Sequence, residues 1–357
     1  MTTSSRTPKQ TRRATIADVA AEMGVAKGTV SRALNGYADI AETTRLRAAR
    51  TAARLGYRPL GSAQAIRTGR CRSMGLVIEA DEHDAHRPFL AEFLAGLSDG
   101  AALEGWTLTV ASAPAGRALE TYERLLSDRK ADGFVLPRTR LDDPRVAVLR
   151  ETDTPFVLFG RHGDPTGCAW YDIDMEGAMR DGVRLLVGRG HRRIAFVGGS
   201  PDHTYARLRA QGFRAGMAQS GLPVPDGYVR DGGIDRTTGA AIFDDLLDRD
   251  DPPTAFVCAI DAAALGLWRA ARVRGLRVGR DLAVLGYDGA PEGAHAEPPL
   301  ATWSVDYEVA GRRLADLLIR RVRGESSEAL REIAPATLLD RGSAAAGPTE
   351  STGRRDS

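Results

Sequence analysis

The sequence predicts an α/β fold, with a small N-terminal all-α head and a larger body of two parallel α/β lobes that enclose a cleft. Helical periodicity runs through residues 15–55, which indicates the head. From residue 74 onward, apolar strand segments alternate with amphipathic helical segments, which is typical of parallel sheets covered on both faces. The body also has roughly 270 residues, which is too many for one open sheet and favours two lobes.

Composition excludes several classes of protein. The 357 residues are 43% hydrophobic and 27% charged, which excludes collagen-like, low-complexity and wholly disordered chains. No segment approaches the roughly 18–20 apolar residues of a membrane span, and the polar N-terminus lacks the apolar core of a secretory signal. Cys71, Cys168 and Cys258 are too scattered for a disulfide framework or a metal site, so we expect a reducing, cytoplasmic location and no metal.

Charge divides the chain unevenly. Residues 1–72 carry 14 Lys and Arg against 4 Asp and Glu, a net charge of +10. The remaining residues carry 35 basic and 43 acidic side chains, a net charge of −8. A basic head on an acidic body favours a polyanion as the partner of the head alone, with a solvated basic tail as the alternative.

Three short helices are predicted in the head. Thr15 and Asp18 form a capping pair at the start of the first helix, and Gly24 ends it. A second helix is expected over 26–34 and a third over 42–55, which together give a helix-turn-helix arrangement. The expected inner faces are Ile16, Val19, Ala20 and Met23 in the first helix, Val30 and Leu34 in the second, and Leu46, Ala49 and Ala53 in the third.

The second helix has the chemistry of a groove-reading element. It presents Lys27, Gly28, Ser31 and Arg32 away from its apolar face. An arginine can pair bidentately with guanine in the major groove, and the hydroxyls of Thr29 and Ser31 can donate to phosphates. The alternative interpretation is a surface helix of a three-helix bundle. The charge of the head favours a helix that enters the major groove of a DNA duplex.

We expect five segments along the chain: a disordered basic arm over 1–14, the head over 15–58, a hinge or linker over 59–72, the body over 73–341 and a disordered tail over 342–357. Ligands of parallel α/β sheets bind at the carboxyl ends of the strands, so the cleft is the expected ligand site. Strands are predicted at 74–80, 106–111, 133–136, 156–159, 193–197, 255–259 and 282–287.

Several motifs, in this order, resemble the lactose-repressor (LacI/GalR) family. In the head they are Thr15 to Ala20, Gly24-Val25, Thr29 to Gly36 and Leu55 to Pro59. In the rest of the chain they are Arg67 to Arg70, Gly75 to Val77, Pro88-Phe89, Gly190 to Gly199, Pro298 to Leu300 and Gly311 to Arg313. The likeness covers residues 15–341.

The resemblance implies a homodimeric transcription regulator that binds double-stranded operator DNA and is not an enzyme. Residues 61–68 would form a hinge helix on operator DNA, with Ile66 as the apolar wedge in the minor groove. Ala26 departs from the usual serine, so the cap hydroxyl of the recognition helix is missing. The implied DNA-binding residues are Thr15, Lys27, Gly28, Thr29, Ser31, Arg32, Asn35, Tyr57, Ile66 and Arg67.

The resemblance also implies a periplasmic-binding-protein-like body that binds a small-molecule effector between its lobes. We expect a sugar, with a nucleobase or nucleoside as the alternative. Met175, Ile234 and Ile260 replace polar or aromatic residues of the family, which makes this pocket less polar. The alternative interpretation is packing in the core or between the lobes for Trp170 and Trp303, and a surface ion pair for Arg209. The expected effector-binding residues are Phe89, Trp170, Asp174, Arg209, Asp261, Asp288 and Trp303.

Enzymatic function has little support in the motifs. The run Val197 to Ser200 follows a strand and contains two glycines, but it is not a dinucleotide-binding fingerprint. The sequence has no phosphate-binding Walker motif. His83, His86 and His162 lack metal-ligand spacing, and we expect them to be polar loop residues. We therefore expect no cofactor. A solute-binding receptor without a DNA function remains the less favoured alternative.

Overall fold

The computed structural model describes residues 14–57, 69–80 and 88–344. The chain divides into two compact units, Met1–Cys71 and Arg72–Ser357. Residues 1–13 of the predicted arm, most of the predicted hinge with Ile66 and Arg67, and residues 345–357 of the predicted tail lie outside the described residues, as do His83 and His86.

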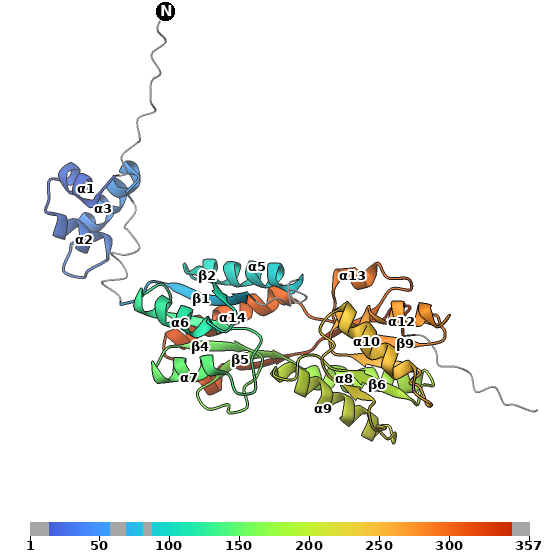
Figure 1. Cartoon of the computed structure of the whole chain (residues 1–357). Coiled ribbons are helices and arrows are strands. Elements are labelled where there is room, and N and C mark those ends of the chain that lie inside the picture. Colours follow the sequence, from blue (N-terminus) through green and yellow to red (C-terminus); the bar gives the residue numbers. More distant parts are fainter. Residues whose placement is uncertain (1–13, 58–68, 81–87, 345–357) are drawn as a thin grey trace, which may run out of the picture. The chain divides into compact units, whose positions relative to one another are not determined.

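The head contains three helices, α1 (Ile16–Met23), α2 (Lys27–Leu34) and α3 (Glu42–Leu55) (Figure 1). Thr15 and Asp18 form the predicted capping box at the start of α1. Gly24 ends α1 with a φ of 65°, a conformation that glycine adopts without strain. The predicted apolar face of α1 is confirmed, since Val19, Ala20 and Met23 are buried.

The inner face of α3 differs from the prediction. Leu46, Ala49 and Ala53 were expected to face the core, but all three are exposed. Ala48 and Ala52 are buried instead, together with the polar Thr51. Small side chains on the inner face let the three short helices approach closely. A prediction guided by the largest apolar residue therefore chose the wrong side of the helix.

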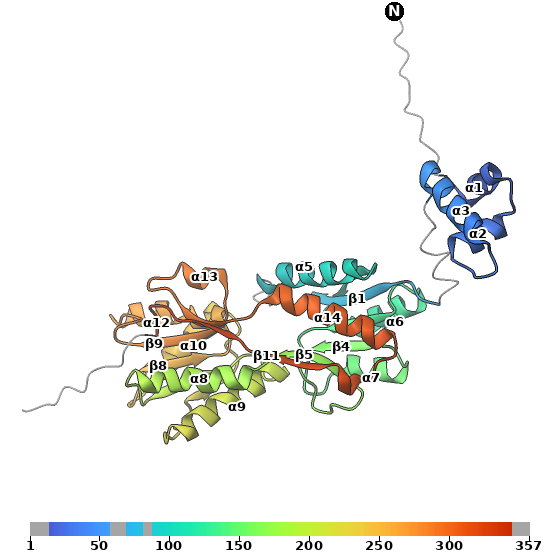
Figure 2. The same ribbon diagram turned by 180° about the vertical axis from the view of Figure 1, so that it is seen from behind.

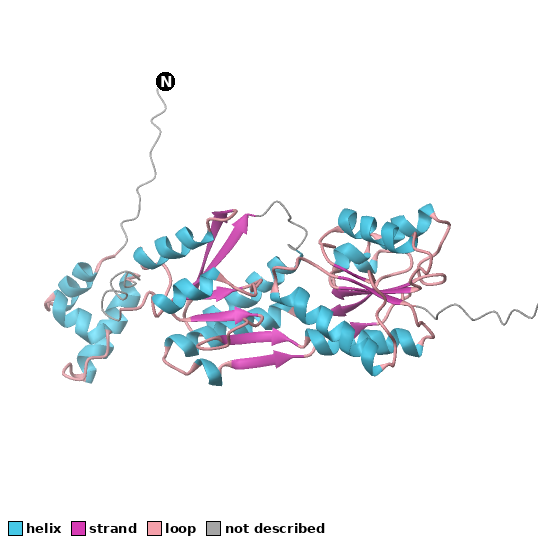
Figure 3. Ribbon diagram, turned by 60° about the horizontal axis from the view of Figure 1, so that its bottom comes forward, coloured by secondary structure: helices cyan, strands magenta, loops and turns pink. Residues whose placement is uncertain are grey.

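The first lobe of the body is built on a six-stranded, wholly parallel sheet with helices on both faces (Figure 3). Its strand order is β11-β5-β4-β3-β1-β2. The strands are β1 (Ser73–Ala80), β2 (Thr107–Pro114), β3 (Gly133–Leu136), β4 (Phe156–Phe159), β5 (Ala169–Ile173) and β11 (Arg331–Ala334). The helical elements are α5 (Pro88–Leu103), α6 (Ala118–Ser127), α7 (Pro144–Glu151), α14 (Tyr307–Val322) and the short 3₁₀ helix η2 (Ser327–Ala329).

The second lobe has a six-stranded sheet in the order β12-β10-β9-β8-β6-β7, parallel except for the antiparallel edge strand β12. The predicted two-lobed parallel α/β body is therefore confirmed. The strands are β6 (Ile194–Val197), β7 (Val229–Arg230), β8 (Ala255–Cys258), β9 (Ala283–Asp288), β10 (Ala301–Ser304) and β12 (Thr337–Leu339). The helices are α8 (Met175–Gly188), α9 (Thr204–Gln219), α10 (Arg236–Leu247), α11 (Asp261–Ala264), α12 (Leu267–Val273) and α13 (Pro291–Ala294).

The chain passes between the lobes three times: from β5 to α8, from β10 to α14, and from β11 to β12. A pair of helices packs tightly in each lobe, α5 with α14 and α8 with α9 (Figures 1 and 2). Glycines permit this packing. A Cβ on Gly311 of α14 would lie 2.5 Å from the Phe93 carbonyl oxygen, and one on Gly216 of α9 would lie 2.8 Å from Cβ of Val183.

The C-terminal boundary of the ordered body lies later than predicted. We expected a disordered tail from residue 342, but Ser343 is fully buried. Its hydroxyl accepts a hydrogen bond from the Ala301 amide and donates to the Val284 carbonyl, both at 2.8 Å. The small and polar residues of this segment predicted a disordered tail. A serine that links two strands by hydrogen bonds cannot be told from a loop serine by sequence alone.

Candidate functional site: a DNA-reading helix and an interlobe cavity

Helix α2 presents the predicted reading residues to solvent. Lys27, Gly28 and Arg32 are exposed, whereas Val30 is buried beneath them. The N-cap residue Ala26 makes no side-chain cap hydrogen bond, as expected from its missing hydroxyl. The Arg32 guanidinium forms an ion pair with Asp39. Because this pair is exposed, it costs little to exchange for a base or a phosphate.

Other predicted DNA-binding residues have partners inside the head. Asn35 caps the end of α2, where its Nδ2 donates to the Ser31 carbonyl at 2.6 Å. The Thr15 hydroxyl takes part in the capping box of α1. Thr29 is half-buried on α2, and Tyr57 packs against the core of the head. Of these four side chains, Asn35 is the one whose hydrogen bond fixes the end of the reading helix.

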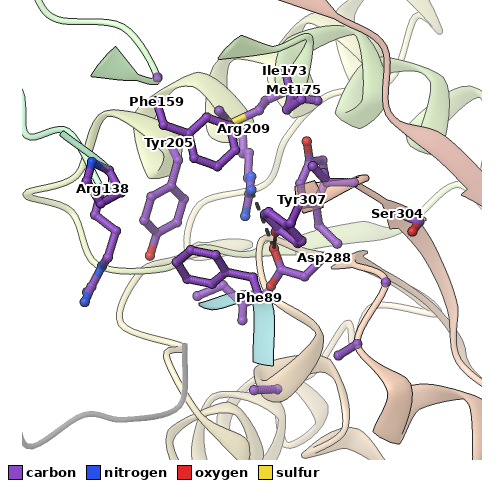
Figure 4. A pocket seen from close by; sticks show the side chains of 18 of the residues that line it. Phe89, Arg138, Phe159, Ile173, Met175, Tyr205, Arg209, Asp288, Ser304 and Tyr307 are labelled. Carbon is purple, nitrogen blue, oxygen red and sulfur yellow. Dashed lines mark hydrogen bonds and ion pairs between the residues drawn. The ribbon is translucent and has the colours of Figure 1, made fainter. Parts of the chain in front are cut away.

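In the body, a cavity of about 430 Å³ lies at the carboxyl ends of the strands of both sheets. The first lobe contributes residues that follow β3, β4 and β5, and the second lobe contributes the ends of β9 and β10 and the start of α9. Of the predicted effector-binding residues, Phe89, Arg209 and Asp288 line it (Figure 4). Met175 and Ile260 line it too, so apolar side chains occupy two of the three positions noted in the sequence, whereas Ile234 does not line the cavity.

Arg209 and Asp288 face each other across the cavity wall, as Figure 4 shows. Nη2 of Arg209 lies 3.8 Å from Oδ1 of Asp288, and Nη1 donates to the Ala259 carbonyl. The guanidinium lies 3.7 Å from the ring centroid of Tyr287. Asp288 has a φ of 126°, which is strained for a residue other than glycine. Strain of this kind is concentrated at binding sites, where it aims a side chain.

Aromatic rings line the cavity beside this pair. The Phe89 ring lies 5.1 Å from that of Tyr307, and Tyr307 lies 6.2 Å from Phe159. The Tyr307 hydroxyl donates to Asp288 at 3.4 Å. The cavity therefore combines flat apolar surface with carboxylate and guanidinium groups, an arrangement that suits a ligand with both apolar faces and hydroxyl groups.

Burial perturbs the acidic groups of this region. It raises the pKa of Asp288 to about 7, a shift that Arg209 opposes and Asp261 reinforces. It also raises the pKa of Asp172 to about 6, although Arg161 and the Ile173 backbone amide favour the ionised form. Raised pKa values in a cleft are typical of functional sites.

Contacts between the lobes border the cavity. Arg161, after β4, donates from Nε to Asp172 at 2.5 Å and from Nη2 to Glu176 at 2.6 Å, so it joins the first lobe to the start of α8. The Thr204 amide donates to the Thr139 carbonyl at 3.0 Å. These bonds fix one orientation of the two lobes.

Four of the predicted effector-binding residues do not line the cavity. Trp170 lies beneath Arg331, 4.3 Å from its guanidinium, and packs on the core of the first lobe. Trp303 is buried in the main core. Asp174 caps α8 and accepts from the Gly177 amide at 2.8 Å. Asp261 is fully buried and accepts from Thr302 Oγ1 at 2.7 Å and from the Ala290 amide at 2.8 Å.

Several polar or aromatic residues that line the cavity were not predicted from the sequence, among them Arg161, Asp172, Tyr205, Tyr287 and Tyr307. Position could have indicated two of them. Arg161 follows the strand predicted at 156–159, and Tyr287 ends the strand predicted at 282–287, so both fall at the carboxyl ends where ligands bind. No signal in the sequence distinguishes Tyr205 or Tyr307 from core tyrosines.

No group of His, Cys, Asp and Glu among the described residues is arranged to hold a metal ion. His162 is a loop residue, as expected, and its Nε2 accepts from the Asp143 amide at 3.3 Å. Within the same described segments, no helix is long and apolar enough to cross a membrane.

A groove-reading head and a two-lobed body with a ligand cavity together define a ligand-responsive DNA-binding regulator. Comparison with protein families agrees. Residues 15–59 match the model for bacterial regulatory proteins of the lacI family, and residues 183–344 match a periplasmic binding protein-like domain. The chain belongs to the LacI family, and it is a transcriptional regulator with a DNA-binding head and an effector-binding body.

Individual relatives cover almost the whole chain. It is 33% identical to the HTH-type transcriptional regulator CelR of Thermobifida fusca, with 92% of this chain and 98% of CelR covered. It is 32% identical to the regulator AglR of Rhizobium meliloti, with 92% and 94% covered. These relatives are regulators and not enzymes.

Solved structures are similar over the same range. A complex of CelR with cellobiose has a TM-score of 0.72 and 32% identity, covering 93% of this chain and 100% of that one. The lac repressor dimer bound to operator and the anti-inducer ONPF has a TM-score of 0.77 and 26% identity, covering 94% and 100%.

Proposed function

We propose that this chain is a homodimeric repressor whose operator affinity is set by a sugar bound in the interlobe cavity. The Arg209–Asp288 pair beside the Phe89 and Tyr307 rings is the observation that carries the proposal. Carboxylate and guanidinium groups bind vicinal hydroxyls, and an aromatic ring stacks on the apolar face of a sugar ring. The cavity of about 430 Å³ has room for more than one such ring.

Two arginines of the cavity are already paired with carboxylates, which favours an uncharged ligand over a phosphorylated one at these two positions. Arg209 faces Asp288, and Arg161 is held by Asp172 and Glu176. An anion bound to either would have to displace a carboxylate, whereas Arg138 and Arg236, which also line the cavity, have no such ion pair among the described residues. CelR, whose solved complex contains cellobiose, is similar in sequence and fold, which supports a saccharide as the ligand class here.

Linkage between the sites follows from the two lobes. A sugar that contacts both lobes stabilises one orientation of them, and operator affinity changes by the ratio of the sugar's affinities for the two orientations. The DNA contacts are proposed for the exposed face of α2, chiefly Lys27 and Arg32, with Ile66 and Arg67 proposed from the sequence alone.

The test is a DNA-binding titration. The purified chain is used to select binding fragments from its own genome, and affinity for the selected fragment is measured by fluorescence anisotropy with and without disaccharides or nucleosides. A sugar-dependent change in affinity supports the proposal. If nucleosides alone change the affinity for DNA, the ligand class is nucleosides and not sugars. The absence of selective DNA binding would overturn the proposed function. Sedimentation equilibrium tests the proposed dimer.

A further inference from the structure

Two buried polar atoms at the cavity have complementary chemistry and come from different lobes. Oδ1 of Asp172, on β5 of the first lobe, has no hydrogen-bond partner among the described residues. The hydroxyl of Tyr287, on β9 of the second lobe, likewise has none there. Both residues line the cavity, Asp172 is fully buried and Tyr287 is 1% exposed.

Unpaired buried polar groups are costly, so a fold that keeps two at a binding cavity indicates a ligand. Arg161 bonds only Oδ2 of Asp172, and no described residue, the Ile173 backbone amide included, meets hydrogen-bond geometry at Oδ1. The two groups also influence each other. Burial is the largest cause of the raised pKa of Tyr287, Arg209 opposes it, and the charges of Asp288 and Asp172 raise it further.

We propose that Asp172 and Tyr287 bind one and the same hydroxyl group of an uncharged, polyhydroxylated effector. The hydroxyl donates to Asp172 Oδ1 and accepts from the Tyr287 hydroxyl, and a hydroxyl is the ligand group that does both at once. Because the two residues belong to different lobes, this single group would join the lobes at the end of the cavity where Arg161 already links them.

This inference rests on the proposed sugar binding and deepens it, because it names the residues that would make a sugar favour one lobe orientation. It also distinguishes ligand classes. A phosphate oxygen would face the Asp172 carboxylate with no proton to donate, whereas an alcohol satisfies both groups. The pair therefore selects for neutral hydroxyls at this end of the cavity.

The test measures binding of cellobiose, maltose, melibiose and sucrose to the full chain by isothermal titration calorimetry. The panel member that binds most tightly is then measured with Asp172→Asn, Tyr287→Phe and the double variant. Each single variant should weaken binding about ten- to a hundredfold. Since both residues bind one hydroxyl, their effects should overlap. The double variant should therefore bind the sugar only slightly less tightly than the single variant with the larger loss of affinity.

Matched controls separate binding from folding. Asp245→Asn removes an exposed carboxylate of the second lobe that pairs with Arg230, and Tyr228→Phe removes a buried hydroxyl of the second lobe that donates to the Asp251 carbonyl. Both should bind the sugar within about twofold of the wild type. Thermal midpoints measured without sugar show whether each variant is folded. If Asp172→Asn is unstable, Tyr287→Phe still tests the proposal, because it deletes a single hydroxyl.

The outcomes distinguish this inference from the proposed function. If a sugar binds and both variants behave like the controls, or if their losses simply multiply in the double variant, the shared hydroxyl is wrong while sugar binding stands. If no member of the panel binds the wild-type chain, the sugar proposal fails and this inference fails with it.

Discussion

Arg209 is positioned by the protein before any ligand arrives. One of its amino groups donates to the Ala259 carbonyl, and the guanidinium plane lies over the Tyr287 ring at 3.7 Å. Its second amino group faces Asp288 at 3.8 Å, too far for a strong hydrogen bond. A ligand hydroxyl placed between them would bond to both, and little side-chain ordering would be required on binding.

Replacing Asp288 tests this site at the residue scale. Asp288→Ala should abolish the response of DNA binding to the effector, because it removes the acceptor opposite Arg209, while operator affinity without effector stays within about threefold. Anisotropy titrations with and without the sugar measure both. Asp245→Asn, an exposed member of an ion pair with Arg230, is the control. A normal response of Asp288→Ala would remove this residue from the binding site.

Replacing Arg32 tests base reading by α2. Arg32→Ala should weaken operator binding by about 1–3 kcal/mol and relax the preference at one base position. Arg54→Ala removes an exposed arginine of α3, whose partner is Glu22, without touching the reading face. Competition binding against operators altered at each position gives the readout. Equal losses on operator and random DNA would instead indicate a contact to phosphate.

At the element scale, the cavity is held by helix pairs whose close approach depends on glycine. Gly311 of α14 lies against the backbone of α5, and a Cβ there would meet the Phe93 carbonyl oxygen at 2.5 Å. Tyr307 begins α14 and Phe89 lies in the first turn of α5. The helix pair therefore also determines how the aromatic wall of the cavity is spaced.

Gly311→Ala should destabilise the body by about 1–3 kcal/mol, because overpacking forces the two helices apart. It should also weaken effector binding, since Phe89 and Tyr307 separate. Gly188→Ala is the matched control, because Gly188 ends α8 with nothing within 4 Å of an added Cβ and should tolerate alanine. Urea unfolding followed by circular dichroism measures the stability of the two variants. Equal stability of the two variants would contradict the packing argument.

Much of the fold could be predicted, because long apolar strands and helical periodicity are visible along the chain. The strands predicted at 133–136 and 156–159 have those bounds in the structure. The short strands β7, β10, β11 and β12 and the strand β5, which contains the buried Asp172, were not predicted. Their lengths or polar residues give no clear apolar run, and only pairing with neighbouring strands defines them.

The position of the cavity was predicted correctly, but the direction in which individual side chains point was not. Asp174 misses the cavity while its neighbours Ile173 and Met175 line it. Trp303 misses it while Ser304 lines it, and Asp261 misses it while Ile260 does so. Adjacent residues near a strand end point to opposite sides, and the sequence does not show which side faces the ligand. Choosing the more polar or aromatic neighbour led to the wrong residue each time.

At the scale of the whole molecule, the body buries carboxyl groups in and beside its cavity. The pKa values of Asp172 and Asp261 are raised to about 6 and that of Asp288 to about 7, in each case chiefly by burial. In the unfolded chain such groups titrate near pH 3.8. Between these values the folded chain binds more protons than the unfolded chain, so stability falls as pH rises.

The thermal midpoint of the chain without effector should therefore be higher at pH 5 than at pH 7.5, by about 2–4 °C for each kcal/mol gained. Asp288→Asn should reduce the fall of the thermal midpoint near pH 7, where Asp288 titrates. The charged or titratable groups that influence Asp288 are Arg209, Asp261 and Tyr307. Carboxyls with lowered pKa values, such as Asp143 and Asp164, act only at more acidic pH. Calorimetry at several pH values checks the sign, and a midpoint that rises with pH over this range would contradict it.

The three chain passages between the lobes have a consequence for how the protein is made. The first lobe needs α14 and β11, which are synthesised after all the strands of the second lobe except β12. On the ribosome, the first five strands must therefore wait, with one edge and one helix-binding face uncovered, until nearly the entire polypeptide has emerged. A nascent chain stalled near residue 300 should recruit chaperones, whereas the N-terminal head, whose contacts are local, is free to fold long before.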